Sequence, residues 1–297
     1  PKYPNNFDCL RRVELGSRVF LFSQIYLLFF KKGLTNKMSK KIGILNLMHD
    51  KIDTQKRFSH VIKEASPETE ITYFYPQSHY LNRPRPQNWP AEPLNLKTVA
   101  KLDGFIVTGA PIELLPFSEV DYWEELTKLF DLLKAKNIPQ LYVCWGAMAA
   151  LYYFYGIGKH PLPEKIFGIY PQEILAPAPL LSGLVTGFRA PHARYAEMNR
   201  SEIEQEKALT INAATPDGHL TLVTGPGQQV FLFSHLEYGP RAFSKEYQRE
   251  LSAIGGDDRK LAKPQRYFAD EAAMSLPQFT WESTQQHFFK NWLQTIK

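Results

Sequence analysis

The stretch LYVCWGAMAA, residues 141 to 150, places a single cysteine between two different patterns. QLYVC (140–144) is an apolar run of strand length, and GAMAALYYFYG (146–156) is an alanine-rich helical pattern. Cys144 is therefore expected in a tight strand-to-helix turn, where Gly146 permits close backbone approach. Two interpretations of this thiol are open. A lone cysteine is more commonly a buried structural group, but this position also suits a nucleophile.

Three more apolar runs of strand length precede this turn: KIGILNL (41–47), ITYFYP (71–76) and GFIVTG (104–109). The strongest helical pattern, residues 119–136, lies between the third run and Cys144. Its apolar side chains follow one helical face, namely Tyr122, Trp123, Leu126, Leu129, Phe130 and Leu133. Strand, helix and strand in this order predict an α/β fold with a mostly parallel sheet and helices on both faces.

The second half of the chain has shorter strand patterns. LTINAA (209–214), LTLVTG (220–225) and QVFLFSH (229–235) are separated by the turn sequences ATPDGH and GPGQQ. The proline-rich stretch 76–93 predicts a surface loop, and the aromatic cluster LYYFYG (151–156) predicts helix packing. We expect these elements to belong to one domain, residues 38–297.

Residues 1–37 differ from the rest of the chain. They hold seven Lys/Arg and two Asp/Glu, which equals the whole net charge of +5, so the remainder is neutral and offers no electrostatic case for nucleic acid. The apolar run VFLFSQIYLLFF (19–30) is too short to cross a membrane, and no cleavage site for a signal peptide follows. We interpret residues 1–37 as a leader of uncertain status, an upstream segment if Met38 is the natural start.

A second polar pair follows the last strand pattern. FLFSHLEYG places His235 and Glu237 two residues apart, and the strand period of two predicts both side chains on one face. A carboxylate there can orient an imidazole that exchanges a proton with a thiol. His-x-Glu alone is a weak signal, more often a surface pair. Together with Cys144, whose helix N-terminus favours a thiolate and can hold an oxyanion, it completes a Cys-His-Glu set.

Several blocks carry a resemblance to a known family. They are C-W-G-A (144–147), H-x-E-Y (235–238), NLMHDKIDT (46–54), VTGAPIE (107–113), VDYWEEL (120–126) and LPEKIFGIY (162–170). In this order, from about residue 40 to the C-terminus, they resemble the homoserine O-acyltransferase family. The resemblance implies a class I glutamine amidotransferase-like, flavodoxin-like sandwich. It also implies acetyl transfer from acetyl-CoA, as a co-substrate, to the side-chain hydroxyl of L-homoserine or L-serine.

The resemblance implies a role for each matching residue. Cys144 would carry the acyl group as a thioester, His235 would act as the base, and Glu237 would hold His235. Lys51 matches a lysine of the oxyanion region, with a solvated loop lysine as the alternative interpretation. Substrate-binding positions match Lys165, Ala193 and Arg249, and a planar guanidinium suits a carboxylate.

Glu113 bears on the acyl donor. In the family, glutamate at the end of G-A-P-x-E accompanies acetyl-CoA, and glycine there accompanies succinyl-CoA. A carboxylate in this place would fill space and repel the free carboxylate of a succinyl group. The resemblance therefore favours acetyl-CoA, with succinyl-CoA as the alternative.

Some positions depart from the family pattern and leave the acceptor open. Met148 stands in place of a glutamine, Ala193 in place of a serine, and His49 in place of a proline. L-serine is one methylene shorter than L-homoserine, and one methylene gives about 1–3 kcal/mol of discrimination. The sequence therefore keeps both amino acids as acceptors for methionine or cysteine biosynthesis.

Other classes of protein are less compatible with the sequence. An amidase would use the same Cys-His-Glu set, and a non-catalytic binding module would need that set to be inert. The histidines are scattered and no metal-binding or phosphate-binding motif occurs, so we expect no metal and no bound cofactor. Cys9 and Cys144 are too far apart in sequence and character for a disulfide framework, which indicates a reducing cytoplasm. A homodimer is common for such folds but leaves no signal here.

Overall fold

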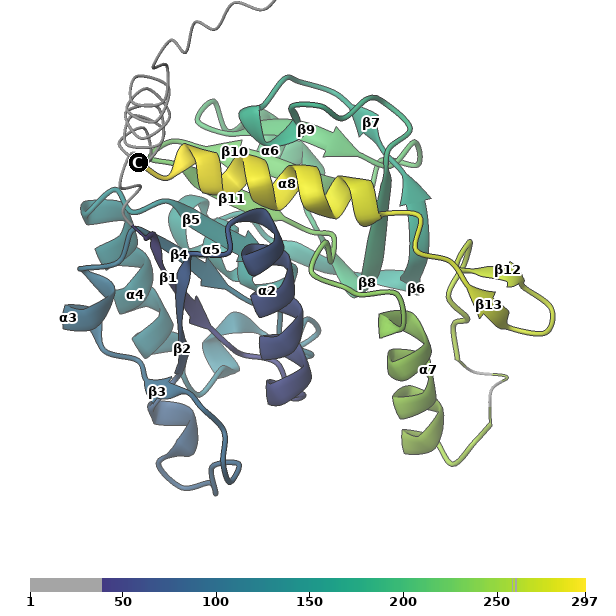
Figure 1. The fold of residues 1–297 in the computed structure, drawn as a ribbon, viewed down its shortest axis with the longest axis horizontal. Coiled ribbons are helices and arrows are strands. Elements are labelled where there is room, and N and C mark those ends of the chain that lie inside the picture. Colours follow the sequence, from purple (N-terminus) through teal and green to yellow (C-terminus); the bar gives the residue numbers. More distant parts are fainter. Residues whose placement is uncertain (1–38, 258, 260) are drawn as a thin grey trace, which may run out of the picture. The chain divides into compact units, whose positions relative to one another are not determined.

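The computed structural model describes residues 39–257, 259 and 261–297 (Figure 1). The predictions on the leader, residues 1–37, and on Met38 as a start therefore lie outside the described residues. Within the described part of the chain, no helix combines the length and the apolar character needed to cross a membrane. The unit Lys40–Lys297 is described below by itself.

The main sheet in this unit is mostly parallel, as predicted. Its order is β3-β2-β1-β4-β5-β11-β10-β9-β7. Strands β3 to β11 in this order pair in parallel, and β10, β9 and β7 continue the sheet with antiparallel pairing. The bounds are β1 Lys41–Leu45, β2 Glu70–Tyr75, β3 Glu92–Pro93, β4 Gly104–Val107, β5 Gln140–Val143, β7 Glu173–Ile174, β9 Thr210–Ala214, β10 Leu220–Gly225 and β11 Gln229–Leu232.

Helices cover both faces of this sheet (Figure 1). On one face lie α2 (Lys51–Ala65) and α8 (Glu282–Thr295), where the rings of Phe58 and Phe289 meet edge to face at 6.5 Å. On the other face lie α4 (Trp123–Ala135) and α5 (Trp145–Tyr155), where Phe130 packs against Tyr142 of β5 at 5.3 Å. The central strands are buried from both sides, which explains why they read as continuous apolar runs. The predicted α/β sandwich is confirmed.

The structure corrects several predicted boundaries. The helix predicted from residue 119 begins at Trp123, because Phe117–Glu119 forms a separate turn of 3-10 helix, η2. The predicted loop 76–93 is mostly exposed, but it contains η1 (Ser78–Tyr80) and β3, and Trp89 is buried. The last predicted strand ends at Leu232 instead of residue 235.

A second layer of structure stands beside the main sheet. Strands β6 (Lys159–Pro171) and β8 (Arg189–Met198) form a two-stranded antiparallel ribbon. Helix α7 (Ala242–Ala253) and the hairpin of β12 (Phe268–Asp270) and β13 (Ser275–Pro277) share an apolar cluster with this ribbon (Figure 1). The short elements α3 (Leu96–Val99), η3 (Pro179–Leu181) and α6 (Arg200–Gln205) complete the fold. The ribbon and α7 carry Lys165, Ala193 and Arg249.

Candidate active site

Cys144 occupies the turn that the sequence predicts. It directly follows β5 and precedes α5, with φ 49° and ψ −112°, a conformation that non-glycine residues rarely adopt. Its N–H donates to the carbonyl of Leu232 at 2.7 Å, and its own carbonyl accepts from Met148 at 3.1 Å. Such a residue costs roughly 1–3 kcal/mol and persists only where its surroundings hold it in place.

Gly146 allows this turn to pack against β4. A Cβ atom at Gly146 would lie 2.8 Å from the carbonyl oxygens of Val107 and Thr108, too close for any other residue without a shift. Glycine is therefore needed at this position, as predicted, because the backbone of α5 lies close to the backbone of Val107 and Thr108.

His235 and Glu237 form a buried pair, but through a turn and not through strand alternation. The N–H of His235 donates to the carbonyl of Pro191 at 2.8 Å, and the N–H of Tyr238 donates to the carbonyl of His235 at 3.0 Å. Within this turn, Nδ1 of His235 lies 2.8 Å from Oε1 of Glu237. The predicted pairing is present, whereas the predicted reason for it is wrong, because the strand has already ended at Leu232.

The imidazole of His235 faces the thiol of Cys144. A Cβ atom at Gly109 would lie 3.4 Å from Cβ of Cys144 and 3.6 Å from Cε1 of His235, so both side chains border the same space. Burial alone would lower the pKa of His235. The charges of Glu237 and Cys144, with hydrogen bonds to both, nevertheless raise that pKa well above its ordinary value. The site therefore favours an imidazolium next to the sulfur.

Tyr238 packs against His235, a contact that is not predicted from the sequence although the H-x-E-Y block contains both residues. Its ring stacks on the imidazole with centroids 4.5 Å apart, and its hydroxyl donates to Oε2 of Glu246 at 2.8 Å. The guanidinium of Arg57 lies 4.7 Å from the same ring. Oε2 of Glu237 is buried and has no hydrogen-bond partner among the described residues.

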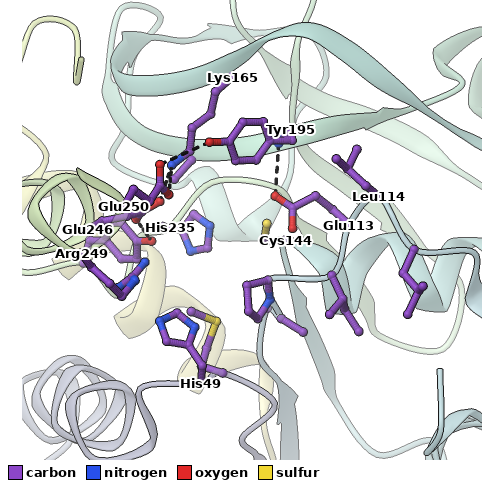
Figure 2. Close-up of a pocket in the computed structure, with 18 residues that line it drawn as sticks. His49, Glu113, Leu114, Cys144, Lys165, Tyr195, His235, Glu246, Arg249 and Glu250 are labelled. Carbon is purple, nitrogen blue, oxygen red and sulfur yellow. Dashed lines mark hydrogen bonds and ion pairs between the residues drawn. The ribbon is translucent and has the colours of Figure 1, made fainter. Parts of the chain in front are cut away.

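Six of the eight predicted site residues line one cavity of about 480 Å³. They are Glu113, Cys144, Lys165, Ala193, His235 and Arg249. In Figure 2, Lys165 and Arg249 lie on one side of this pocket and Glu113 lies on the other, with Cys144 and His235 between them. Glu237 stands behind His235, outside the lining. The pocket is also lined by residues for which the sequence predicts no role, namely His49, Tyr195, Tyr238, Glu246 and Glu250.

Lys165 and Arg249 differ in how their charges are compensated. The side chain of Lys165 is buried, and its Nζ lies 2.7 Å from Glu246 and 2.6 Å from Glu250. Burial opposes the charge, but the two carboxylates raise the pKa of Lys165. Arg249 has no hydrogen bond or ion pair with any residue that the structure describes, and its guanidinium faces the pocket (Figure 2). Within the described lining of this pocket, Arg249 is therefore a cation available to a carboxylate.

Glu113 and Ala193 face the pocket from other elements. Oε1 of Glu113 accepts a hydrogen bond from the N–H of Tyr195 at 3.2 Å, which holds the carboxylate near Cys144 (Figure 2). Ala193 lies on β8 with its neighbours His192 and Arg194 on the opposite, buried face. A serine at Ala193 would add a hydroxyl to the pocket wall.

Lys51 is the predicted residue that the structure separates from the others. It is the first residue of α2 and lines a neighbouring cavity of about 630 Å³ instead of the one that contains Cys144. Burial lowers the pKa of Lys51 to about 8. Among the residues with coordinates described, no cluster of His, Cys, Asp and Glu has the arrangement of a metal site.

The fold and the bent strand-to-helix junction define the class. Solved glutamine amidotransferases from Thermotoga maritima and Methylobacillus flagellatus match with TM-scores of 0.56 each. The first covers 87% of this chain and 96% of its own at 13% identity, and the second covers 87% and 95% at 12% identity. These similarities show a class I glutamine amidotransferase-like fold.

Sequence comparison identifies the family within this fold. The family described as Homoserine O-succinyltransferase matches residues 34–297. The chain is 49% identical over 268 residues to a serine O-acetyltransferase of Lactobacillus acidophilus, covering 89% of this chain and 97% of that protein. A serine O-acetyltransferase of Lacticaseibacillus casei is 45% identical (88% and 96% covered), and a homoserine O-acetyltransferase of Thermotoga petrophila is 36% identical (85% and 83%). The chain belongs to the homoserine O-succinyltransferase family, and it is an O-acyltransferase.

Proposed function

We propose that this enzyme transfers an acetyl group from acetyl-CoA to the side-chain hydroxyl of L-serine. The observation that carries the chemistry is the presence of Cys144 and His235 in one pocket, with Glu237 hydrogen-bonded to Nδ1 of His235. The choice of serine rests on the greater identity to the two serine O-acetyltransferases, 49% and 45%, than to the homoserine enzyme, 36%. L-homoserine is the second candidate acceptor.

In the first half-reaction, the sulfur of Cys144 attacks the thioester carbonyl of acetyl-CoA after His235 has taken the thiol proton. A new C–S bond forms to Cys144, and the C–S bond to CoA breaks. The departing CoA thiolate takes the proton from His235 and leaves as CoA-SH. Backbone N–H groups of Trp145, Gly109 and Ala110 would bind the developing oxyanion, whereas the N–H of Thr108 already donates to the carbonyl of Leu45 and Pro111 has no N–H.

In the second half-reaction, the hydroxyl of serine replaces CoA beside His235. His235 takes the hydroxyl proton while the oxygen attacks the acetyl carbonyl on Cys144. The C–S bond breaks, the proton returns to the sulfur, and O-acetylserine leaves. Glu237, hydrogen-bonded to Nδ1, stabilises the imidazolium in both steps.

The pocket walls supply the proposed selectivity. Arg249, which makes no ion pair with the described residues, would bind the carboxylate of the acceptor, and Ala193 would border the acceptor side chain. Lys165 would contribute as part of its ion-pair network with Glu246 and Glu250. Glu113 would disfavour a succinyl donor, whose free carboxylate it would repel.

The broader setting belongs to the same proposal. Residues 38–297 would act as one domain, with acetyl-CoA as a co-substrate and no resident cofactor. The enzyme would act in the cytoplasm, in the biosynthesis of cysteine or methionine. Its binding partners would be its small-molecule substrates, and a homodimer is the oligomeric state to test.

Parallel steady-state kinetics test the acceptor. With acetyl-CoA saturating, kcat/KM should be higher for L-serine than for L-homoserine, by roughly 10-fold or more given the worth of one methylene. A higher kcat/KM for L-homoserine would assign the second candidate instead. Hydrolysis of L-glutamine without acetyl-CoA would favour an amidase.

A further inference from the structure

Glu237 borders a different cavity from the one that contains Cys144 and His235. This Glu237 cavity measures about 390 Å³, and its lining comes from α2, from residues 237–241 and from the start of α7. The lining has two carboxylates and five basic side chains, namely Asp53 and Glu237 with Lys56, Arg57, His60, Arg241 and Lys245. Positive charge therefore prevails in this cavity.

Arg57 differs from the other basic residues of the Glu237 cavity in its burial. Its side chain is 15% exposed, whereas the side chain of Lys245 is 57% exposed and that of His60 is 68% exposed. Lys56 and Arg241 are exposed residues as well. Water and salt screen charges at exposed positions, so Arg57 carries the least screened positive charge of this lining.

Arg57 contacts the proposed Cys-His-Glu set through Tyr238. Its guanidinium lies 4.7 Å from the ring of Tyr238, and that ring stacks on the imidazole of His235 with centroids 4.5 Å apart. The two distances limit the separation between guanidinium and imidazole to about 9 Å, which is shorter than the Debye length of about 10 Å in 0.1 M salt. The charge of Arg57 therefore acts on the proton of His235.

Glu237 needs positive charge near its second carboxylate oxygen. Oε1 lies 2.8 Å from Nδ1 of His235, whereas Oε2 is buried and has no hydrogen-bond partner within the part of the chain that the structure describes. Such an oxygen is costly unless an opposite charge lies near it. Burial opposes the charge of Arg57, but interactions with Tyr238 and with the two carboxylates of the lining raise the pKa of Arg57 above its ordinary value. Arg57 therefore stays charged and compensates part of the charge of Glu237.

The proposed reaction needs His235 to release its proton as well as to hold it. Burial favours the neutral imidazole, but Glu237 and Cys144 raise the pKa of His235 well above its ordinary value. In the proposed acetyl-enzyme Cys144 has no charge, so Glu237 and the cation that offsets it then dominate. The other titratable groups that act on His235 or line its pocket stay the same in every variant below, and they include His49, Glu113, Lys165, His192, Glu246, Arg249 and Glu250.

We propose that Arg57 is a positioning residue of the Cys-His-Glu set, which holds Tyr238 against His235 and offsets part of the charge of Glu237 so that the imidazole can give up its proton. The inference rests on the proposed function, since it concerns the base of that reaction. Arg57 does not line the pocket of Cys144. It therefore acts through its neighbours and not on a substrate.

The pH dependence of kcat/KM for L-serine tests this role, because its acid limb reports the ionisation of His235 in the acetyl-enzyme. Arg57→Gln should move this limb to higher pH by about 0.5–1 unit, since Glu237 then holds the proton of His235 more tightly. Arg57→Lys keeps the charge and should leave the limb within about 0.3 unit of wild type. A change in stability alone would not move the limb.

Lys245→Gln is the matched control. Lys245 pairs with Asp53, as Arg57 does, and lines the same cavity, but its side chain is mostly exposed. Lys245→Gln should therefore leave the limb within about 0.2 unit of wild type. An equal shift in Lys245→Gln would overturn the proposal. An unshifted or lowered limb in Arg57→Gln, or an equal displacement in Arg57→Lys, would overturn it as well.

NMR titration of the His235 imidazole separates this inference from the proposed function. In a Cys144→Ala background, where no thiol titrates at this position, Arg57→Gln should raise the pKa of His235 by about 0.5–1 unit. Arg57→Met, which also lacks the charge, should show the same rise. If the rise occurs but the enzyme acetylates neither L-serine nor L-homoserine, the proposed function is wrong and the role of Arg57 stands. If acetylation occurs and the pKa is unchanged, the role of Arg57 is wrong and the proposed function stands.

Discussion

The two walls of the pocket are built in different ways. Cys144 and His235, on the wall made by the main sheet, are 5% and 4% exposed and are held by backbone hydrogen bonds to Leu232 and Pro191. The wall made by the β6–β8 ribbon and α7 is more open, since Tyr195 is 37% exposed and Arg249 is exposed as well. The difference teaches that backbone hydrogen bonds, from Cys144 to β11 and from His235 to β8 of the ribbon, fix the proposed reacting groups, while side chains of the ribbon and α7 present charges that can select a substrate. Mutations on the two walls should therefore have different kinetic signatures.

The largest effect is expected at Cys144. Cys144→Ala should lower kcat by at least about 10³-fold, because the proposed nucleophile is lost. Wild type incubated with acetyl-CoA alone should gain an acetyl group on the peptide that contains Cys144, as measured by mass spectrometry. Full turnover in Cys144→Ala would show that Cys144 does not act as the nucleophile.

Glu237→Gln comes next. Loss of the carboxylate charge should lower kcat by roughly 10²- to 10⁴-fold, since the buried imidazolium loses its stabilising partner. The pKa of His235, which Glu237 helps to raise, should fall, and NMR titration of the imidazole measures it.

The same raised pKa links His235 to stability. The folded protein binds this proton more tightly than the unfolded chain does. The contribution to the free energy of unfolding is therefore fully present below the unfolded pKa of about 6.5 and is lost as pH rises through the folded pKa. Urea unfolding at several pH values should show that the free energy of unfolding depends less on pH in Glu237→Gln than in wild type. An unchanged pKa and an unchanged dependence would contradict the coupling.

Arg249→Gln should produce a milder and different change on the opposite wall. We expect KM for the amino acid to rise about 10-fold or more, because the carboxylate loses a charged partner. The rate of acetyl-enzyme formation from acetyl-CoA, measured without acceptor, should not change. Arg241→Gln, a cation at the start of the same helix, is the control. A slower first half-reaction in Arg249→Gln would show that Arg249 also affects formation of the acetyl-enzyme, so that its role is not limited to the acceptor.

The smallest expected effect is a change of donor ratio at Glu113. Glu113→Gly should raise kcat/KM for succinyl-CoA relative to acetyl-CoA by several-fold, because both the bulk and the negative charge are removed. Glu113→Gln removes the charge and keeps the size, so a comparison of the two variants separates repulsion from space. An unchanged ratio in both would exclude Glu113 from donor choice.

The main sheet and the position of Cys144 were predictable because their signals are local. Buried parallel strands read as apolar runs, and the Cys144 turn lies between a strand and a helix pattern that adjoin in sequence. The β6–β8 ribbon gave no such signal. Its first strand contains Pro161 and Pro163 and shifts register between Pro161 and Ile166, so its apolar alternation is broken.

The rest of the site depends on contacts between distant parts of the chain. Lys165 meets Glu246 and Glu250 across separations of 81 and 85 residues, so the sequence could not show that its charge is compensated. The same holds for Lys51, which matched a family position but lies in the neighbouring cavity because of how α2 and the loop after β2 pack. The resemblance indicated which side chains matter, and only the packing shows which of them share a cavity.

The backbone conformation of Cys144 has a consequence for heat tolerance. Its φ of 49° suits glycine better than any residue with a Cβ atom. Cys144→Gly should therefore unfold at a higher temperature than Cys144→Ala, by an amount equivalent to about 1 kcal/mol, although neither variant has a thiol. The protein thus gives up thermal stability at the residue that we propose as its nucleophile.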